Sequence, residues 1–414
     1  MSDVLDIVVI GAGIVGVSTA LELQSRGRSV TVIDRVGVAE ETSRGNAGAF
    51  AYTDIVPLAT PGIMRKAPKW LFDPLGPLSI PPSYALKIAP WMLRFWRASW
   101  KDRYMASLSA QSAMMDFSRA ALERQIAAVD GEPMMQRDGQ IMLYESEAEF
   151  RASLPSWQLR KDHGIPYDLL KSPEEIAEIQ PGLSRQFTHA GYTPTWMNTV
   201  DPAAWTRHLA AEFEAGGGKI QRADITQVTP LDGRLRLSTA AGEIMAGTLV
   251  ICAGAWSHKL AAQLGDKIPL ETERGYNTTL PEGAFDLRTH VTFGGHGFVM
   301  TRINGGVRVG GAVELGGLEL APNYKRADTL LAKAKQFAPA LETSGGTQWM
   351  GFRPSLPDSL PVIDRAPQAP QVVYAFGHGH LGLTQSAGTA ELVADLLSDS
   401  PAKIDMSAFA ATRF

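Results

Sequence analysis

A glycine-rich turn near the N-terminus constrains the fold of this chain more than any other feature. Gly11, Gly13 and Gly16 form the pattern G-x-G-x-x-G directly after a short apolar run rich in Val and Ile. A helical pattern follows, and a second apolar run at 30–33 ends at Asp34. Strand, glycine turn, helix and strand in this order are typical of a parallel sheet that binds a dinucleotide. The sequence therefore predicts an α/β chain with a Rossmann-like domain.

The turn offers what the phosphates of a dinucleotide need. Gly11 permits the tight turn, Gly13 lets the backbone approach a pyrophosphate, and Gly16 lets helix and strand pack closely. The helix after the turn presents free N–H groups and the positive end of its dipole to the phosphates. Asp34 lies about 20 residues further on, where a carboxylate accepts a hydrogen bond from a ribose hydroxyl. Three neighbouring residues are expected to line the same site: Ile14, Val15 and Arg35.

Length and composition exclude several classes of protein. The chain has 414 residues, 45% of them hydrophobic and 20% charged, which is typical of a soluble protein with two domains. The formal net charge of -4 gives no sign of nucleic-acid binding. The single cysteine, Cys252, precludes an intrachain disulfide and argues against a metal site. We find no signal-peptide pattern and no long uncharged apolar window, and therefore expect a cytoplasmic protein without a transmembrane helix.

The segment after Asp34 resembles a known family. Residues 43–48 read S-R-G-N-A-G, which is similar to the S-x-x-N-A-G loop of the glycine oxidase and D-amino-acid dehydrogenase (DAO) family of FAD-dependent oxidoreductases. A solvated turn is the alternative, since Ser, Gly and Asn all favour turns. The resemblance implies that the loop lies along the pyrophosphate and ribityl chain and reaches the flavin. The cofactor residues that it implies here are Thr42, Ser43, Asn46, Ala47 and Gly48.

Two later segments extend the resemblance over nearly the whole chain. Residues 349–365 contain a G-x-R-P-x-x-P-D-x-x-P run, and residues 377–384 read G-H-G-H-L-G-L-T at the start of the last helical pattern. A strand and small-residue turn around 243–256 resemble a second FAD contact, and the strand near 225 is expected to lie against the adenine. The residues so implied are Ile225, Ala253, Gly254, Trp256, Arg353, Gly377, His378, Gly379, His380, Leu381, Gly382, Leu383 and Thr384. The 42–48 loop contains no Cys or His, and no Cys follows Cys252, so we expect non-covalent FAD.

Few side chains are needed for amine oxidation, because the cofactor supplies the chemistry. Arg353 is the first catalytic candidate, since a guanidinium fork suits a substrate carboxylate and the resemblance assigns this position to carboxylate binding; the alternative is a surface salt bridge. Tyr276 is a candidate second carboxylate contact, Tyr52 a pocket residue and His296 a substrate contact. For these three, partial burial without a role is an equal alternative. His378 and His380 are expected to support the flavin through backbone turns.

Domain organisation follows from the same resemblance. Residues 1–60, 185–265 and 350–414 are predicted to form a discontinuous FAD-binding domain. Residues 61–184 and 266–349 are predicted to form a substrate-binding domain with an antiparallel sheet, because the chain there alternates short apolar runs with glycine turns.

The resemblance implies oxidative deamination of a D-amino acid or a cyclic D-imino acid of the D-proline or hydroxy-D-proline type. Hydride would pass to flavin N5, giving an imine that hydrolyses or cyclises, and electrons would pass to a quinone or the respiratory chain. The alternatives are a peroxide-forming glycine or opine oxidase and an FAD-dependent 2-hydroxyacid dehydrogenase with His296 as base. A flavin-binding subunit that relays electrons without a substrate pocket is a further alternative.

Residues 60–110 are rich in Pro and Trp. Trp91, Phe95 and Trp96 recur at helical spacing among several Lys and Arg residues. Such a helix suits a membrane surface or a quinone-docking site, which would make the protein peripheral on the inner face of the inner membrane. Packing of the aromatic side on the protein's own core is the alternative, and we favour it.

Overall fold

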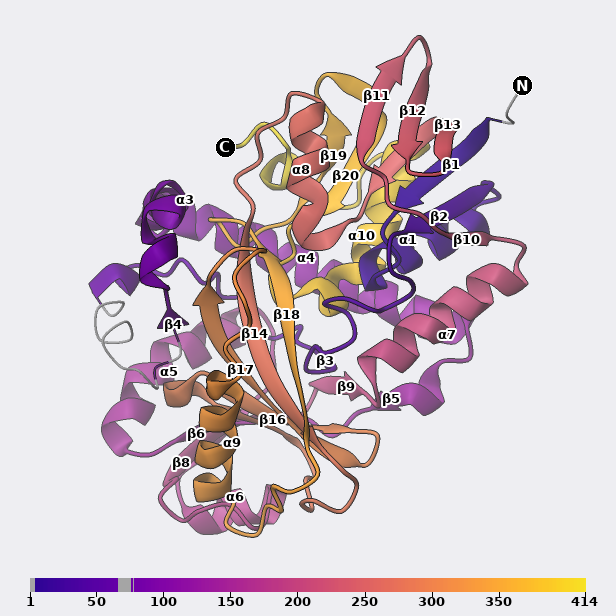
Figure 1. Cartoon of the computed structure of the whole chain (residues 1–414). Helices are drawn as coiled ribbons and strands as arrows, with labels where there is room; N and C mark the ends of the chain where they lie inside the picture. Colours follow the sequence, from indigo (N-terminus) through magenta and orange to yellow (C-terminus); the bar gives the residue numbers. More distant parts are fainter. Residues whose placement is uncertain (1–3, 66–75, 77) are drawn as a thin grey trace.

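The computed structural model describes residues 4–65, 76 and 78–414. Two large sheets dominate it, one in the upper and one in the lower half of Figure 1. The chain passes between them several times, so each sheet is assembled from segments far apart in sequence. This bears out the predicted α/β fold, in which a Rossmann-like sheet is joined to a largely antiparallel one.

The first sheet has eight strands in the order β10-β2-β1-β13-β12-β11, and β20 pairs with β13 and β19. Strands β10, β2, β1, β13 and β20 pair in parallel, as the N-terminal pattern predicts. The strands are β1 (Leu5–Ile10), β2 (Val30–Asp34), β10 (Lys219–Arg222), β11 (Gln227–Leu231), β12 (Arg234–Thr239), β13 (Gly242–Ile251), β19 (Val362–Ala366) and β20 (Ala369–Phe376).

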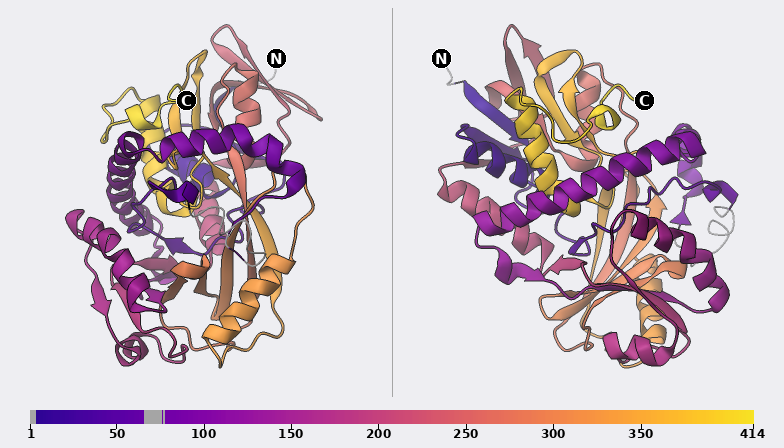
Figure 2. Two further views of the ribbon diagram at one scale, coloured as in Figure 1. Left: turned by 90° about the vertical axis from the view of Figure 1, so that its left-hand side faces the viewer. Right: turned by 180° about the vertical axis from the view of Figure 1, so that it is seen from behind.

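Helices cover both faces of this sheet because its central strands are apolar on both sides. Ile7 and Val9 of β1 pack in a core with the helices of one face, and Val8 and Ile10 pack in a second core on the other face. The first core holds α1 (Ile14–Ser25), α4 (Lys101–Ala128), α7 (Pro202–Ala215) and α10 (Gly382–Leu397). The second holds α8 (Ser257–Gln263). Seen from behind, α4 crosses the molecule as one long helix (Figure 2, right).

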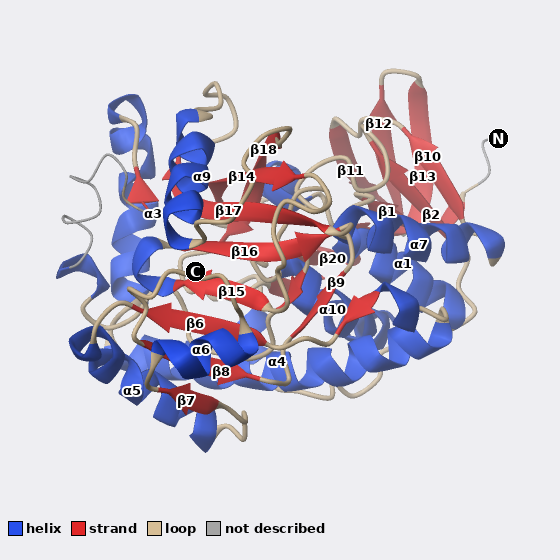
Figure 3. Cartoon of the chain, turned by 90° about the horizontal axis from the view of Figure 1, so that it is seen from below, coloured by secondary structure: helices blue, strands red, loops and turns tan. Residues whose placement is uncertain are grey.

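The second sheet has nine strands in the order β18-β14-β17-β16-β15-β6-β8-β7, with β4 on β17 (Figure 3). Most of its pairs are antiparallel, as predicted for the region after residue 266. Its strands are β4 (Leu78–Ser79), β6 (Gln140–Tyr144), β7 (Asp168–Leu170), β8 (His189–Thr193), β14 (Glu271–Leu280), β15 (His290–Phe293), β16 (Phe298–Ile303), β17 (Gly306–Leu315) and β18 (Thr347–Ser355). Its helices are α3 (Ala85–Ala98), α5 (Glu147–Asp162), α6 (Pro173–Ile179) and α9 (Lys325–Phe337).

A third, small sheet joins β3 (Ala49–Phe50), β9 (Met197–Thr199) and β5 (Met135–Gln136).

The proposed domain boundaries stay a prediction. Strand pairing adds that β8, which lies inside 185–265, and the whole of β18, which crosses residue 350, belong to the nine-stranded sheet. Among the described residues, no helix is long and apolar enough to cross a bilayer.

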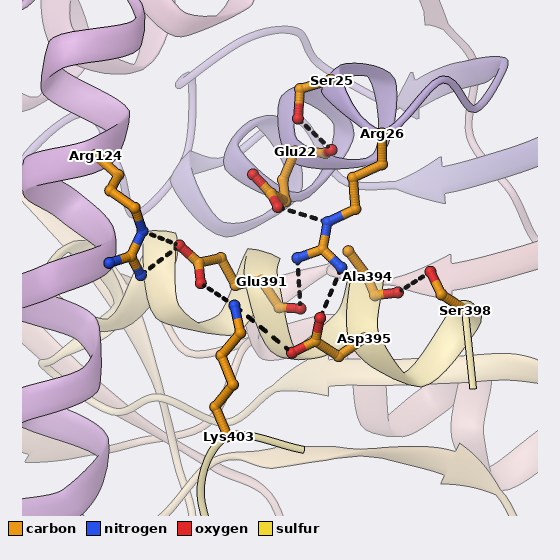
Figure 4. A network of polar contacts seen from close by, with 9 residues as sticks. All are labelled: Glu22, Ser25, Arg26, Arg124, Glu391, Ala394, Asp395, Ser398 and Lys403. Atoms are coloured by element: carbon orange, nitrogen blue, oxygen red, sulfur yellow. Dashed lines mark hydrogen bonds and ion pairs between the residues drawn. The ribbon is translucent and has the colours of Figure 1, made fainter. Parts of the chain in front are cut away.

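Two carboxylates on α10 tie this helix to its neighbours (Figure 4). Asp395 accepts a hydrogen bond of 2.6 Å from Arg26 at the end of α1, and its side chain is only 6% exposed. Glu391 accepts hydrogen bonds from Arg124 of α4 and from Lys403. A buried carboxylate that loses its charge leaves the facing cation without a full partner. These contacts therefore fix α10, whose first turn lies at the cofactor cavity described below.

We expect Asp395→Asn to lower the free energy of unfolding by about 1–3 kcal/mol, because Arg26 loses a charged acceptor at a poorly solvated site. Chemical denaturation of the FAD-loaded protein measures the change. Arg151→Gln is the matched control, since the Arg151–Glu147 pair is 72% and 62% exposed and its loss should leave the midpoint unchanged. Equal midpoints for Asp395→Asn and the parent would contradict the structural role of this contact.

Candidate functional site

A cavity of about 960 Å³ is lined by residues of both large sheets. It begins at the carboxyl ends of the parallel strands of the first sheet, where ligands of such sheets bind. It ends among side chains of β6, β14, β17 and β18 in the second sheet. Its size is at the upper end for small-molecule sites, so it suits a dinucleotide together with a small substrate.

The glycine turn fits its expected task. Gly11 has a φ of +111°, and a Cβ there would lie 2.4 Å from the Cys252 carbonyl oxygen. A Cβ at Gly16 would lie 1.9 Å from the Gly11 carbonyl oxygen, so only glycine lets α1 approach the turn this closely. The Ile14 N–H donates to Ser43 Oγ at 3.0 Å. The start of α1 is thus held against both the sheet and the 43–48 loop.

Asp34 and Arg35 lie at the next part of the cavity wall. The Asp34 carboxylate accepts hydrogen bonds from the N–H groups of Ala12, Val36 and Gly37 at 2.7–2.8 Å, which fixes its position at the end of β2. The Arg35 guanidinium lies 3.8 Å over the Trp256 ring and pairs with Glu41. A flat, charged and aromatic surface of this kind suits an adenine and its ribose.

The 42–48 loop is tied to the second sheet. Thr42 Oγ1 donates to the Phe352 carbonyl at 2.8 Å, and Asn277 Nδ2 donates to the Gly45 carbonyl at 2.7 Å. Arg308 donates to the Asn46 carbonyl; burial lowers the pKa of Arg308 to about 10. Trp349 covers Gly45, where a Cβ would lie 2.1 Å from the indole. The loop therefore has a fixed path along the cavity.

The glycine turn at 377–384 closes the other side of the cavity. Gly377 and Gly379 have φ values of +88° and +56°, and the Gly379 N–H donates to the Pro354 carbonyl. The His378 ring contacts Thr389, and burial lowers its pKa to about 3, so the ring is neutral at neutral pH. His380 also lines the cavity, and its expected backbone role stays a prediction; burial lowers the pKa of its imidazole, while Asp54 and Glu273 act in the opposite direction.

Arg353 lies at the substrate end of the cavity. Its Nη1 donates to the Ala312 carbonyl at 2.9 Å, and the guanidinium lies over Gly275, where a Cβ would lie 2.4 Å from Nη2. Burial lowers the pKa of Arg353, and nearby Glu273 raises it. Ala312 has a φ of +56°, and the β14–β17 register shifts there. This bulge directs the Ala312 carbonyl toward Arg353.

Tyr276 lines the cavity, but its hydroxyl is engaged elsewhere. It donates to Glu314 and accepts from the Asn323 N–H, and burial raises the pKa of Tyr276 to about 12. Glu273, Gly275 and Asn277 share the opposite face of β14, because side chains alternate along a strand. The Tyr276 hydroxyl therefore points away from the Arg353 face, and its role as a second carboxylate contact stays a prediction without support from this arrangement.

Tyr52 and His296 lie outside the cavity lining. Tyr52 is 8% exposed and stacks on Phe50, and burial raises its pKa well above the usual value. His296 pairs with Glu145 at 3.3 Å and packs on Phe337.

Four predicted cofactor residues lie behind the wall of the main cavity: Gly16, Gly48, Leu381 and Thr384. The other predicted cofactor residues all line it.

Several cavity residues were not singled out from the sequence. Glu273 is 5% exposed and faces Arg353 directly across the β14–β18 pair. Asp54 follows the flavin loop, and its carboxylate lies 3.6 Å from Arg160. β14 reads E-T-E-R-G-Y-N-T-T-L, so no local pattern separates Glu273 from its polar neighbours, and only its burial in the fold marks it. Further lining residues are Gln140, Met142, Trp196, His290, Arg308 and Trp349.

Comparison with known proteins decides the family. The model of the FAD dependent oxidoreductase family DAO matches residues 6–396. The chain belongs to this family. It is 36% identical to a D-amino-acid oxidase of Bradyrhizobium diazoefficiens over 99% of this chain and 98% of that protein. It is 31% identical to a D-amino acid dehydrogenase of Rhizobium rhizogenes over 99% of this chain and 100% of that protein.

Solved structures support the fold of this DAO-family chain. Glycine oxidase from Geobacillus kaustophilus matches with a TM-score of 0.80 at 20% identity, over 99% of this chain and 98% of that chain. L-proline dehydrogenase from P. horikoshii matches with a TM-score of 0.76 at 21% identity, over 100% of this chain and 98% of that chain. The protein is an FAD-dependent oxidoreductase. The cavity fits FAD, since Gly13 lines it with no side chain at a point where a Cβ would lie 3.1 Å from Ser43 Oγ, and the Arg35–Trp256 stack lies next to Asp34.

We expect Gly16→Ala to purify with little FAD and to be less stable by about 1–3 kcal/mol, because the new methyl group forces α1 away from the Gly11 carbonyl. The ratio of flavin to protein absorbance and the denaturation midpoint measure both effects. Ser18→Ala in the same helix is the control, since the Ser18 hydroxyl is buried and has no hydrogen-bond partner among the described residues. Full FAD occupancy in Gly16→Ala would show that the close approach is not needed.

Proposed function

We propose that this protein oxidatively deaminates a D-amino acid or a cyclic D-imino acid of the D-proline or hydroxy-D-proline type, and passes the electrons to a quinone or the respiratory chain. The names of the relatives at 31–36% identity, D-amino-acid oxidase and D-amino acid dehydrogenase, support this substrate class. The observation that carries the proposal is the half-buried Arg353 guanidinium, a cation on the cavity face of β18 that is directed by the Ala312 carbonyl.

In this proposal, the cavity divides between cofactor and substrate. The turn at 11–16 holds the pyrophosphate and Asp34 a ribose hydroxyl. The 42–48 loop and the 377–384 turn hold the flavin, non-covalently, because neither contains a cysteine. When bound, FAD accepts the hydride that leaves the substrate α-carbon.

Arg353 binds the substrate carboxylate. One N–H group of its guanidinium is used by the Ala312 carbonyl, which sets its direction, and the remaining N–H groups are available to a planar anion. A carboxylate at a site shielded from water interacts more strongly with a guanidinium than at a surface. The substrate is thereby oriented with its α-carbon at a fixed distance from the cofactor site.

The substrate nitrogen must lose a proton before oxidation, because its lone pair expels the hydride. Asp54 and Glu273 give this end of the cavity negative charge that favours an incoming ammonium group. His380 lines the same region, where burial lowers the pKa of its imidazole and favours the neutral form that accepts a proton. The imine product then hydrolyses to a 2-oxo acid and ammonium, or stays cyclic when the substrate is an imino acid.

The alternatives use the same cavity. A peroxide-forming oxidase differs only in the acceptor, and the oxidase name of the relative from B. diazoefficiens favours keeping it as a second candidate. A 2-hydroxyacid dehydrogenase with His296 as base gains no support, because His296 pairs with Glu145 outside the cavity. A subunit without its own substrate would have no need of a half-buried arginine that faces this cavity.

Removal of the guanidinium tests the proposal. Anaerobic mixing of the FAD-loaded protein with a panel of D- and L-amino acids, D-proline, cis-4-hydroxy-D-proline, glycine, sarcosine and a 2-hydroxyacid is followed by bleaching of the flavin absorption. We expect bleaching by a D-amino or D-imino acid, and a loss of about 10²-fold or more in kcat/KM for Arg353→Ala.

Arg185→Ala is the matched control, because this arginine is 74% exposed and does not line the cavity. It should bleach like the parent, and Arg353→Lys should recover part of the lost rate, since lysine keeps the charge without the fork. Bleaching by 2-hydroxyacids alone, or full activity in Arg353→Ala, would overturn the proposed function.

The acceptor is tested on the substrate-reduced protein. We expect slow reoxidation when air is admitted and fast reoxidation by a soluble ubiquinone analogue, measured as the return of flavin absorption. Stopped-flow traces at equal acceptor concentration give the ratio of the two rates. Faster reoxidation by oxygen, with stoichiometric hydrogen peroxide, would select the oxidase alternative and leave the role of Arg353 intact.

A further inference from the structure

Helix α3 has an apolar outer face that nothing in the described chain covers. Leu86 is 90% exposed and Leu93 is 64% exposed, and two turns of helix place them on one side. The face continues at the corner with α4, where Trp96 and Trp100 are 47% and 48% exposed and their rings meet edge to face. Helix α3 lies at the outside of the molecule in Figure 1 and in the left view of Figure 2.

The outer face is not needed to hold α3 in place. Ile88 and Trp91 on the inner side form a buried cluster with Leu315 at the end of β17, and Phe95 packs against it. For Trp91 and Phe95 this confirms the interpretation that the aromatic side packs on the protein's own core, whereas Trp96 is 47% exposed. This buried cluster accounts for only the inner side of α3. The apolar outer side remains in water, and exposed apolar patches of this kind mark interaction sites.

Basic side chains surround this face. Residues 81–106 contain five Lys or Arg and one acidic residue, although the whole chain has a net charge of -4. Only Arg97, which binds Asp102, has a carboxylate partner among the described residues. The basic residues are Lys87, Arg94, Arg97, Lys101 and Arg103.

We propose that the α3 outer face, formed by Leu86, Leu93, Trp96 and Trp100 with these basic residues, docks on the surface of an anionic phospholipid bilayer. Leucine and tryptophan enter the boundary between headgroups and acyl chains, and Lys and Arg bind lipid phosphates. An excess of positive charge on a chain that is negative overall matches a lipid surface of opposite sign. A symmetric dimer through this face would bring the same basic residues of two copies together, and like charges repel.

The position of α3 connects this surface with the cavity. Phe95 lines a small space of about 10 Å³ whose other walls include Leu58, Glu273 and residues 377–380, all of which also line the main cavity. A bilayer on the outer face of α3 therefore lies one helix thickness from the glycine turn. This arrangement deepens the proposed function, since it brings a membrane-dissolved quinone near the cofactor, but binding to lipid does not depend on it.

The test uses the full, FAD-loaded chain and vesicles of phosphatidylglycerol mixed with phosphatidylcholine, or of phosphatidylcholine alone. Sedimentation at low and high salt measures the bound fraction. We expect binding to the anionic vesicles that weakens with salt. Leu86→Gln with Leu93→Gln, and separately Lys87→Gln with Arg94→Gln and Lys101→Gln, should each lower the partition constant by roughly tenfold or more.

The matched control is Lys219→Gln with Leu231→Gln and Arg234→Gln, which removes exposed side chains of the same kinds from β10–β12 and should bind like the parent. The flavin of every variant should bleach with substrate at the parental rate. A failure of the proposed function would show in this bleaching assay, and a failure of lipid docking would show in the sedimentation assay. No binding of the parent to anionic vesicles, or unchanged binding in both variants, would overturn the proposal. So would a dimer in solution, without lipid, that the Leu86 and Leu93 changes dissociate.

Discussion

The hydrogen bonds that Asn277 and Arg308 donate to the carbonyl groups of Gly45 and Asn46 join the two halves of this protein. The loop that receives them begins just after the parallel sheet, while the donors lie on β14 and β17 of the other sheet. Because a loop of small residues has little tendency to hold one shape, side chains from elsewhere must fix its path. Trp349 over Gly45 and the Thr42 contact to β18 complete the same connection. The cofactor region and the substrate region are therefore one structural unit, whatever the domain boundaries.

Much of the cofactor half could be predicted from the sequence because its constraints are local. Gly11 and Gly16 must be glycine for reasons of backbone geometry, and the strands beside them are apolar on both faces, so pattern and structure agree. The hairpin between β16 and β17 was also signalled by glycine; its turn is Asn304–Gly305, with φ values of +49° and +76°, and Gly306 begins the next strand. Short-range rules locate such features to within about one or two residues.

The substrate end could not be predicted with the same success, because it depends on which face of a strand meets the cavity. Tyr276 and Asn277 are neighbours in sequence, but Asn277 binds the flavin loop and the Tyr276 hydroxyl binds Glu314 on the other side. Likewise, His296 follows a strand that contributes to the cavity, yet its ring turns to Glu145 and Phe337. Residue type suggested a substrate contact for Tyr276 and for His296. For Tyr276, the alternation of side chains along the strand decides which neighbour faces the cavity.

Arg353 and Glu273 show why the arrangement of charges matters more than their number. They face each other across β14 and β18, yet the guanidinium donates to the neutral Ala312 carbonyl, and the ion pairs of the described residues do not include Arg353 with Glu273. A direct pair would satisfy both charges and leave little attraction for a substrate carboxylate. The bulge at Ala312, with its left-handed backbone, supplies the acceptor that keeps the guanidinium directed away from Glu273. The strained residue thus preserves a separated cation and anion, which is the charge pattern that a zwitterionic amino acid complements.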